Sequence, residues 1–205
     1  MKLTTWNVNG MRAALRKGFF RHLELINPDV LLLQEVRAFP EQLPDEVRSP
    51  SGWHVIWNPA VRPGYSGTAI WSRQPMQLRG TRLSARRPDD EGRLIEVSVC
   101  GLEVVCVYLP SGSSGPARQQ VKDEWLKRFR LWTDRRRSGV PLIFGGDINV
   151  AHTERDIFHA KSNEQTSGFL PHEREWFGKL LKSGWHDLVR EYHGDCDGPY
   201  SWWSN

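Results

Sequence analysis

The 205-residue sequence has few cysteines, no long apolar run and no internal repeat or low-complexity segment. Its three cysteines, Cys100, Cys106 and Cys196, are an odd number without C-x-x-C spacing, which argues against a disulfide framework or a zinc knuckle. No apolar run approaches the roughly 20 residues of a membrane helix, and the N-terminus lacks the apolar core of a signal peptide. We therefore expect a cytoplasmic protein without membrane contact, with Cys100 and Cys106 as small core residues on strands.

The composition is that of an ordinary globular protein, with 39% hydrophobic and 25% charged residues. A chain of this length can bury one sizeable core, so we expect residues 1–205 to form a single domain and a monomer. The net charge of +4 permits a polyanionic partner without requiring one. Ten tryptophans are more unusual: many will lie in the core, but the adjacent Trp202 and Trp203 would suit stacking on a nucleic acid.

Four short apolar runs, each typical of a strand, deliver oxygen-bearing side chains at their C-terminal ends. In chain order these side chains are Asn7, then Gln34 with Glu35, then Tyr108, and finally Asp147 with Asn149. Packing does not explain such a recurrence, whereas one shared pocket at the edge of a sheet does. The alternative for Asp147 and Asn149 is an Asx turn that caps the next segment.

Glu35 and Asp147 would be two like charges in this pocket, an arrangement that favours a bound divalent cation. The expected metal ligands are Asn7, Glu35, Asp147 and Asn149, whose oxygen atoms are hard donors. Because the sequence has no paired cysteines and no H-x-x-x-H, these ligands favour Mg²⁺, or Mn²⁺, over Zn²⁺.

Two basic or aromatic segments are candidates for phosphate contact. A helix is expected from Met11 to Ile26, and Arg12 lies off its apolar stripe; the alternative is a solvated basic face. Tyr65 lies in the Gly-flanked loop 62–67, which either approaches a phosphate backbone or simply connects a hairpin.

The remaining pattern predicts short strands, hairpins and a few long helices, hence an α/β sandwich with sheets inside and helices outside. A helix from Pro116 is expected to bury Val121, Trp125, Phe129 and Trp132, and another helix starts at Pro171. The arginine-rich segment Arg79–Arg93 is interpreted as a mostly solvated connection.

Eight segments together resemble the exodeoxyribonuclease III type of apurinic/apyrimidinic endonucleases, within the endonuclease/exonuclease/phosphatase superfamily. They run in family order across nearly the whole chain: TTWNVNGMR (4–12), LLLQE (31–35), GYSGTAI (64–70), EGR (91–93), VYLPSG (107–112), GGDINVAH (145–152), GF with EREWF (168–177) and YSWWS (200–204).

This resemblance implies a four-layered α/β sandwich of two packed mixed sheets flanked by helices. It also implies Mg²⁺-dependent cleavage of double-stranded DNA 5′ to abasic sites, with 3′ to 5′ exonuclease and 3′ end-cleaning activity. Asn7 and Glu35 match the metal positions, and Tyr108 matches the active-site tyrosine. Asp147 matches the acid that deprotonates the attacking water, and Asn149 the amide that steadies the transition state. Trp202 matches the aromatic lining the pocket for the flipped-out sugar.

The sequence also departs from the family pattern. Ser111 stands where Asn or Gln is usual, which shortens a DNA contact, and Leu170 stands where Thr is common. The family's closing strands and terminal Ser-Asp-His are missing, so we expect a C-terminally truncated domain that lacks its last strands. Two outcomes follow for its activity: the chain is inactive, or Glu35, Asp147 and Asn149 suffice without the missing histidine. Two alternatives are a phosphodiesterase acting on a non-DNA substrate and a non-catalytic DNA-binding fragment.

Overall fold

The computed structural model describes residues 1–84, 89–136 and 139–201. The chain divides into two compact units, the first made of Met1–Tyr108 and Gly139–Ile148 and the second of Leu109–Ser138 and Asn149–Asn205. Across the described ranges, none of the helices combines the length and the apolar character that crossing a membrane requires.

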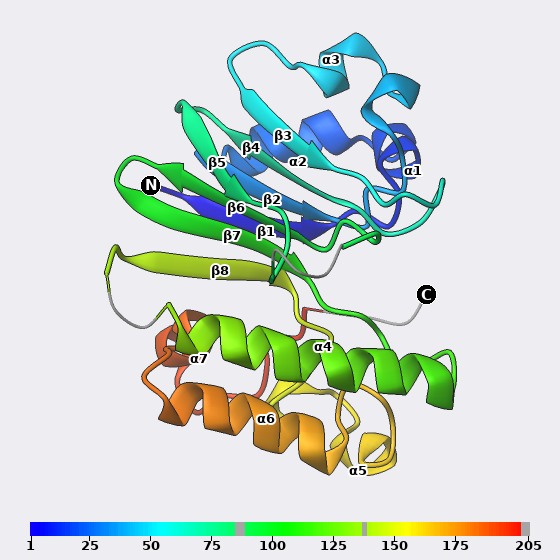
Figure 1. The fold of residues 1–205 in the computed structure, drawn as a ribbon, viewed down its shortest axis with the longest axis vertical. Helices are drawn as coiled ribbons and strands as arrows, with labels where there is room; N and C mark the ends of the chain where they lie inside the picture. Colours follow the sequence, from blue (N-terminus) through cyan, green and yellow to red (C-terminus); the bar gives the residue numbers. More distant parts are fainter. Residues whose placement is uncertain (85–88, 137–138, 202–205) are drawn as a thin grey trace. The chain divides into compact units, whose positions relative to one another are not determined.

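The first unit contains all eight described strands and three short α-helices (Figure 1). Its elements are β1 (Leu3–Asn7), α1 (Met11–Arg16), α2 (Phe19–Ile26), β2 (Val30–Gln34), the 3₁₀ turn η1 (Pro40–Gln42), α3 (Asp45–Arg48), β3 (His54–Asn58), β4 (Thr68–Ser72), β5 (Met76–Gly80), β6 (Leu94–Val99), β7 (Leu102–Tyr108) and β8 (Leu142–Asp147). The second unit contains α4 (Pro116–Asp134), the 3₁₀ turn η2 (Glu154–Asp156), α5 (Ala160–Asn163), α6 (Pro171–Lys182) and α7 (Leu188–His193).

The strands form two mixed four-stranded sheets, in the orders β1-β2-β4-β3 and β5-β6-β7-β8. The pairs β1/β2 and β7/β8 are parallel and the other pairs antiparallel. Every residue of β2 and β4 is buried, as expected for apolar strands in the middle of a sheet that is covered on both faces. The two parallel pairs matter for function because their strands end in the predicted site residues.

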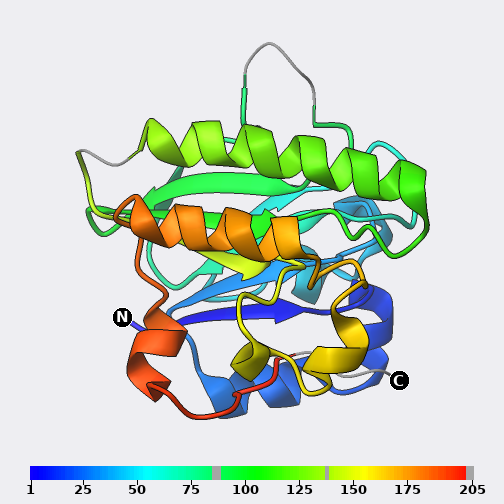
Figure 2. The same ribbon diagram turned by 90° about the horizontal axis from the view of Figure 1, so that it is seen from below.

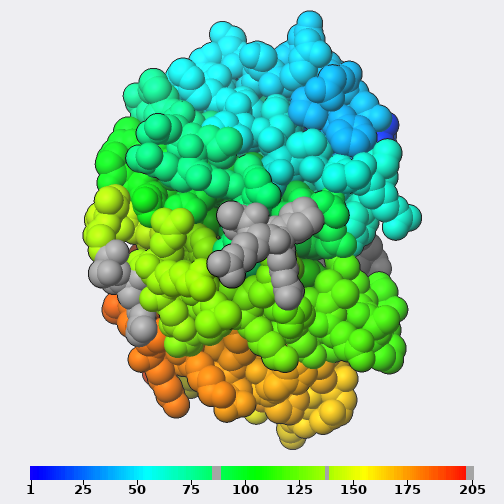
Figure 3. All heavy atoms as spheres, viewed as in Figure 1, coloured from blue at the N-terminus to red at the C-terminus, as the bar shows by residue number. Residues whose placement is uncertain are grey.

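Because side chains along a strand alternate between the two faces of the sheet, the apolar residues of the first unit form a cluster on each face of the first sheet. Met11, Phe19 and Leu23 of α1 and α2 pack on the face of the first sheet that carries Leu31 and Trp71. The opposite face packs on the second sheet through a cluster made of Val30, Leu32, Ile70, Ile95, Val97, Val99, Val104 and Cys106. The first unit is therefore layered as helices, sheet and sheet. On the face in Figure 3, the cyan to teal-green chain from η1 to β5 forms much of its surface.

The polar side chain of Gln34 is buried between the two sheets. Its amide nitrogen donates to Cys106 Sγ (3.3 Å), and its amide oxygen accepts from Thr5 Oγ1 (3.2 Å). Burial raises the pKa of the Cys106 thiol to about 12, although its contacts with Gln34 and the Leu33 carbonyl act in the opposite direction. The expectation for Cys106 is confirmed, whereas Cys100 is exposed in the turn between β6 and β7, where its φ is +50°.

We expect a thiol reagent to modify Cys100 and Cys196 in the native protein and Cys106 only after unfolding. The first two are exposed, while Cys106 is fully buried and stays protonated near neutral pH. The measurement is the number of reactive thiols before and after denaturant is added. Rapid modification of all three in the native protein would contradict the buried position of Cys106.

Two predictions for the first unit were wrong. The single helix expected from Met11 to Ile26 is interrupted, because Gly18 adopts a left-handed conformation (φ 85°) between α1 and α2. The segment Arg79–Arg93 is not simply a solvated connection: it begins in β5, and the Arg93 side chain is only 2% exposed. Arg93 is buried because several acceptors and an aromatic ring surround it, as described below.

In the second unit α4 and α6 lie side by side (Figures 1 and 2), joined by a hydrogen bond from Trp176 Nε1 to the Leu126 carbonyl (3.0 Å). Trp125, Phe129 and Trp132 of α4 are buried as predicted. Val121, however, is 45% exposed, and its neighbour Lys122 is completely buried instead. Apolar periodicity alone could not predict this reversal, because Lys122 is buried with a charged partner on α6.

Candidate active site

The predicted side chains of the first unit meet where β1, β2, β7 and β8 end. Asn7 is the last residue of β1, and Glu35 directly follows β2. In the second sheet Tyr108 and Asp147 are the paired last residues of β7 and β8. The site was expected at the edge of one sheet, but two sheets contribute to it. Their strand ends meet because the sheets pack face to face.

The centre of the site is the side-chain amide of Asn7. Its nitrogen donates to Glu35 Oε1 (2.9 Å) and to Asp147 Oδ2 (2.8 Å), so one NH₂ group bridges two carboxylates. Arg37 pairs with the other oxygen of Glu35. Two half-buried carboxylates repel each other unless hydrogen-bond donors or cations lie close to them. Here the Asn7 amide and the Arg37 guanidinium reduce that repulsion.

The loop after β2 holds Glu35 in an uncommon backbone conformation. Glu35 and Arg37 have φ values of +55° and +52°, a region that non-glycine residues rarely occupy. The Glu35 and Val36 carbonyls accept hydrogen bonds from the amides of Gly10 (2.7 Å) and Met11 (2.8 Å), and the Arg37 amide donates to Ser66 (2.8 Å). Such conformations persist only where surrounding bonds impose them, and they concentrate at functional sites.

Tyr108 is buried next to these acids. Burial, together with the charge of Glu35 and a hydrogen bond to it, raises the pKa of the phenol. Arg93 acts in the opposite direction, with its Cζ atom 4.4 Å from the centre of the Tyr108 ring. Because the shift is upward from about 10, Tyr108 remains a hydrogen-bond donor at every pH at which the protein is expected to work.

Arg93 is a site residue that sequence reasoning missed. Its guanidinium donates to the Tyr108 carbonyl (3.0 Å), to Glu91 Oε2 (2.5 Å) and to the Tyr65 hydroxyl (3.3 Å). Tyr65 in turn donates to Glu91 Oε1 (3.3 Å), so the loop expected to contact DNA is tied to the active-site tyrosine. The EGR segment (91–93), one of the segments that resemble the family, was the available signal, but its arginine was interpreted as solvated.

Gly92 is required at the centre of that segment. Its φ is +59°, and a Cβ atom there would lie 2.2 Å from the Asn58 carbonyl oxygen. Any side chain would push Glu91 and Arg93 away from Tyr65 and Tyr108.

The donor set fits a hard divalent cation. The NH₂ group of Asn7 brings Glu35 Oε1 and Asp147 Oδ2 toward a single point, where the two carboxylates offer oxygen ligands. The Asn7 oxygen accepts from the Asn9 amide (3.0 Å), so Asn7 would become a third oxygen ligand by turning its amide over. A second group of possible ligands, Asp123, His172 and Glu173, lies in the second unit. Glu173 already accepts hydrogen bonds at both oxygens and pairs with the buried Lys122, so a cation would have to displace these partners.

Three further predicted residues fall in the second unit. Asn149 has a left-handed backbone (φ 53°), and its amide nitrogen donates to the Leu109 carbonyl (2.8 Å). Ser111 Oγ forms a hydrogen bond with Ser113 Oγ (2.9 Å), which closes a tight turn. Trp202 lies outside the described residues.

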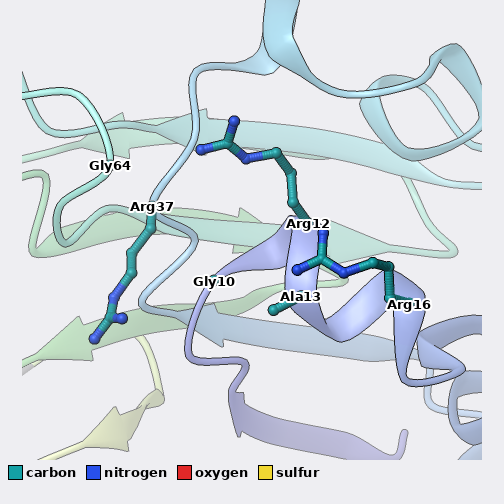
Figure 4. A pocket seen from close by; sticks show the side chains of 6 residues that line it. All are labelled: Gly10, Arg12, Ala13, Arg16, Arg37 and Gly64. Atoms are coloured by element: carbon teal, nitrogen blue, oxygen red, sulfur yellow. The ribbon is translucent and has the colours of Figure 1, made fainter.

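Beside Glu35 is a pocket of about 330 Å³ lined by Gly10, Arg12, Ala13, Arg16, Arg37 and Gly64. Figure 4 shows Arg12 and Arg16 extending from α1 and Arg37 extending from the loop after β2. Arg12 was predicted from the sequence; Arg16 joins it because residues four apart lie on one face of a helix. In Figure 4 the Arg37 guanidinium points away from those of Arg12 and Arg16, and it pairs with Glu35. The guanidinium groups of Arg12 and Arg16 favour an anionic ligand.

We expect Arg12→Ala and Arg16→Ala each to weaken duplex binding and to reduce its salt dependence. If each side chain neutralises one phosphate, the slope of log K against log salt falls by about 0.9 per substitution. Arg21→Ala on α2, also exposed, is the matched control and should leave the slope unchanged. Equal slopes for all four proteins would exclude phosphate from this pocket.

Comparison with known proteins shows which family the chain is similar to. The model of the Endonuclease/Exonuclease/phosphatase family matches residues 4–205. The chain is 38% identical to the exodeoxyribonuclease of Bacillus subtilis, covering 100% of this chain and 80% of that protein. It is 32% identical to the DNA-(apurinic or apyrimidinic site) endonuclease of Dictyostelium discoideum, and here it spans 57% of the relative's length.

The fold agrees as well. The structure of an AP endonuclease from Archaeoglobus fulgidus matches 95% of this chain and 75% of its own, with a TM-score of 0.83 and 26% identity. The α/β sandwich expected from the sequence is thereby confirmed. The chain belongs to the endonuclease/exonuclease/phosphatase family and, within it, to the nucleases known as exodeoxyribonucleases and AP endonucleases.

Proposed function

We propose that this protein cleaves DNA phosphodiester bonds 5′ to abasic sites in a Mg²⁺-dependent reaction. The observation that carries the proposal is the Asn7 amide, which bridges Glu35 and Asp147 at 2.9 and 2.8 Å. This constellation supplies a cation site and a general base at one point. The relative named as an AP-site endonuclease supports abasic DNA as the substrate. The relative named as exodeoxyribonuclease and a solved structure named as a 3'-5' exonuclease support removal of nucleotides from 3′ ends.

In the proposed mechanism Asp147 accepts a proton from the water that attacks phosphorus, the bond from phosphorus to the 3′ oxygen breaks, and this leaving oxygen takes up a proton from solvent. Tyr108, held protonated by burial and by Glu35, has a single O–H and would turn it from Glu35 to a phosphoryl oxygen. Asn149 donates an amide N–H where negative charge develops; its bond to Leu109 orients the group and uses one of its two amide protons. A cation bound by Asn7 and Glu35 would neutralise the non-bridging oxygens.

Arg12, Arg16 and Arg37 would hold the DNA backbone, and Tyr65 would lie against it. Trp202 would line the pocket for the flipped-out sugar. We also propose 3′ end-cleaning activity, a monomeric state and a cytoplasmic location. Mg²⁺ is proposed over Mn²⁺ as the working cation because carboxylate and amide oxygens suit it and it is the usual partner of phosphate substrates.

The deciding experiment measures nicking of a labelled duplex that carries one abasic analogue, with Mg²⁺ and with a chelator. Mg²⁺-dependent nicking on the 5′ side of the lesion is the expected result. Salt-sensitive DNA binding without turnover would favour a non-catalytic DNA-binding protein. Cleavage of other phosphodiesters, but not of DNA, would show that the substrate is a different phosphodiester, while the roles proposed for the site residues would still stand.

A further inference from the structure

A lysine and a glutamate form an ion pair in the interior of the second unit. Lys122 Nζ on α4 lies 2.6 Å from Glu173 Oε1 on α6, and both side chains are 0% exposed. Removing two charged groups from water has a large desolvation penalty. Their mutual attraction offsets this penalty only when further hydrogen bonds satisfy the remaining donors and acceptors of both groups. The partners of this pair therefore indicate what it holds in place.

The pair binds two backbone segments. Lys122 Nζ donates to the Asn149 carbonyl (2.7 Å) and to Ser167 Oγ (3.3 Å). Glu173 Oε2 accepts from the amides of Gly168 (2.6 Å) and Leu170 (3.1 Å). The Ala151 amide donates to the Gly168 carbonyl (2.8 Å), so the segment around Asn149 is fixed from both sides.

The same pair reaches the loop that carries Ser111. Glu173 Oε1 accepts from Gln119 Nε2 (2.9 Å), and the Gly112 amide donates to Ser167 Oγ (3.1 Å). A Cβ atom at Gly112 would lie 1.9 Å from Gln119 Oε1, so the loop packs directly on this network. Gly112 is buried for that reason.

Asn149 needs such support. Its left-handed backbone is disfavoured for residues with a side chain, although asparagine tolerates it better than most. The Leu109 carbonyl orients its amide, and the Lys122 ammonium holds its backbone carbonyl. Misplacing such a donor by about 1 Å can cost about 100-fold in rate.

We propose that Lys122, paired with Glu173, is a positioning residue that fixes Asn149 for donation to the transition state. The inference rests on the proposed function, in which Asn149 acts on the phosphoryl group. Lys122 has no contact with substrate in this role, so its loss should lower kcat and leave KM nearly unchanged. We expect kcat to fall by about 10- to 100-fold.

Four variants test the proposal. Lys122→Met removes the ammonium but leaves Glu173 buried without its cation, which itself destabilises the fold. The double variant Lys122→Met with Glu173→Met removes both charges and should fold while kcat stays low. Lys122→Arg keeps the charge and should recover most of kcat. Lys127→Met changes an exposed lysine of the same helix and should behave like the wild type.

Each variant is followed by thermal melting, by kcat and KM on abasic DNA, and by the NMR resonance of the Asn149 side-chain amide. That resonance should shift in the double variant and stay near its wild-type position in Lys122→Arg. A folded double variant with wild-type kcat and an unmoved resonance would overturn the proposal. If the wild type does not nick abasic DNA, the proposed function fails, and the resonance of Asn149 still decides whether Lys122 positions it.

Discussion

Replacing Asp147 by asparagine is expected to lower the rate of abasic-site nicking by about 10²- to 10⁴-fold, the range usual for loss of a general base. Asparagine has nearly the same shape and can still accept a hydrogen bond from Asn7, so the contact seen at 2.8 Å survives. It cannot take a proton from water. The loss should therefore appear in kcat, while DNA affinity and melting temperature remain close to those of the wild type.

The measurement is single-turnover nicking of duplex DNA with one abasic analogue at saturating Mg²⁺. Asp45→Asn is the matched control: its carboxylate is exposed, pairs only locally with Arg48 in α3, and should have no effect on the rate. Nicking by Asp147→Asn at the wild-type rate would remove Asp147 from the role of base. Loss of folding in this variant would instead indicate a structural role.

The strand ends of the site could be predicted because strands have strong local signals. Short apolar runs bounded by glycine, proline or polar residues predict β1, β2, β7 and β8, and the side chain after each run follows from its position. The structure confirms that Asn7, Glu35 and Asp147 meet. It corrects the prediction of one sheet, because sequence pattern does not show which strands pair and which sheets stack.

Buried charged residues were beyond the reach of sequence reasoning. Arg93 was assigned to solvent together with its segment, and Lys122 was not singled out, because arginine and lysine are rarely buried unless paired. Their partners are distant in sequence: Lys122 on α4 pairs with Glu173 on α6, and Arg93, just before β6, lies over the ring of Tyr108 at the end of β7. Such pairs become visible only when the fold brings their elements together.

Replacing Glu35 by glutamine is expected to abolish most metal binding, with a loss of affinity above about 100-fold. Changing a residue that only hydrogen-bonds to a metal ligand already lowers metal affinity by about 10- to 100-fold. Glu35 would supply a ligating carboxylate itself, so its loss should lower the affinity further. Glutamine keeps the shape and the amide-to-oxygen contact with Asn7, but it removes the charge that a cation and Arg37 both require. Folding should change little, because losing the Arg37 pair is offset by relief of repulsion between Glu35 and Asp147.

The direct measurement of this prediction is Mn²⁺ binding, followed by the loss of the free-ion signal in electron paramagnetic resonance, without DNA or turnover. Glu41→Gln in the nearby turn η1 alters an exposed glutamate and should leave affinity unchanged. If the cation were instead held by Asp123, His172 and Glu173, Glu35→Gln would bind Mn²⁺ as the wild type does, and Asp123→Asn would not. The two substitutions together therefore decide which acidic group is the metal centre. We expect Glu35 and Asp147 to be that group: Glu173 already pairs with Lys122, whereas the Asn7 amide between Glu35 and Asp147 can turn its oxygen toward a cation.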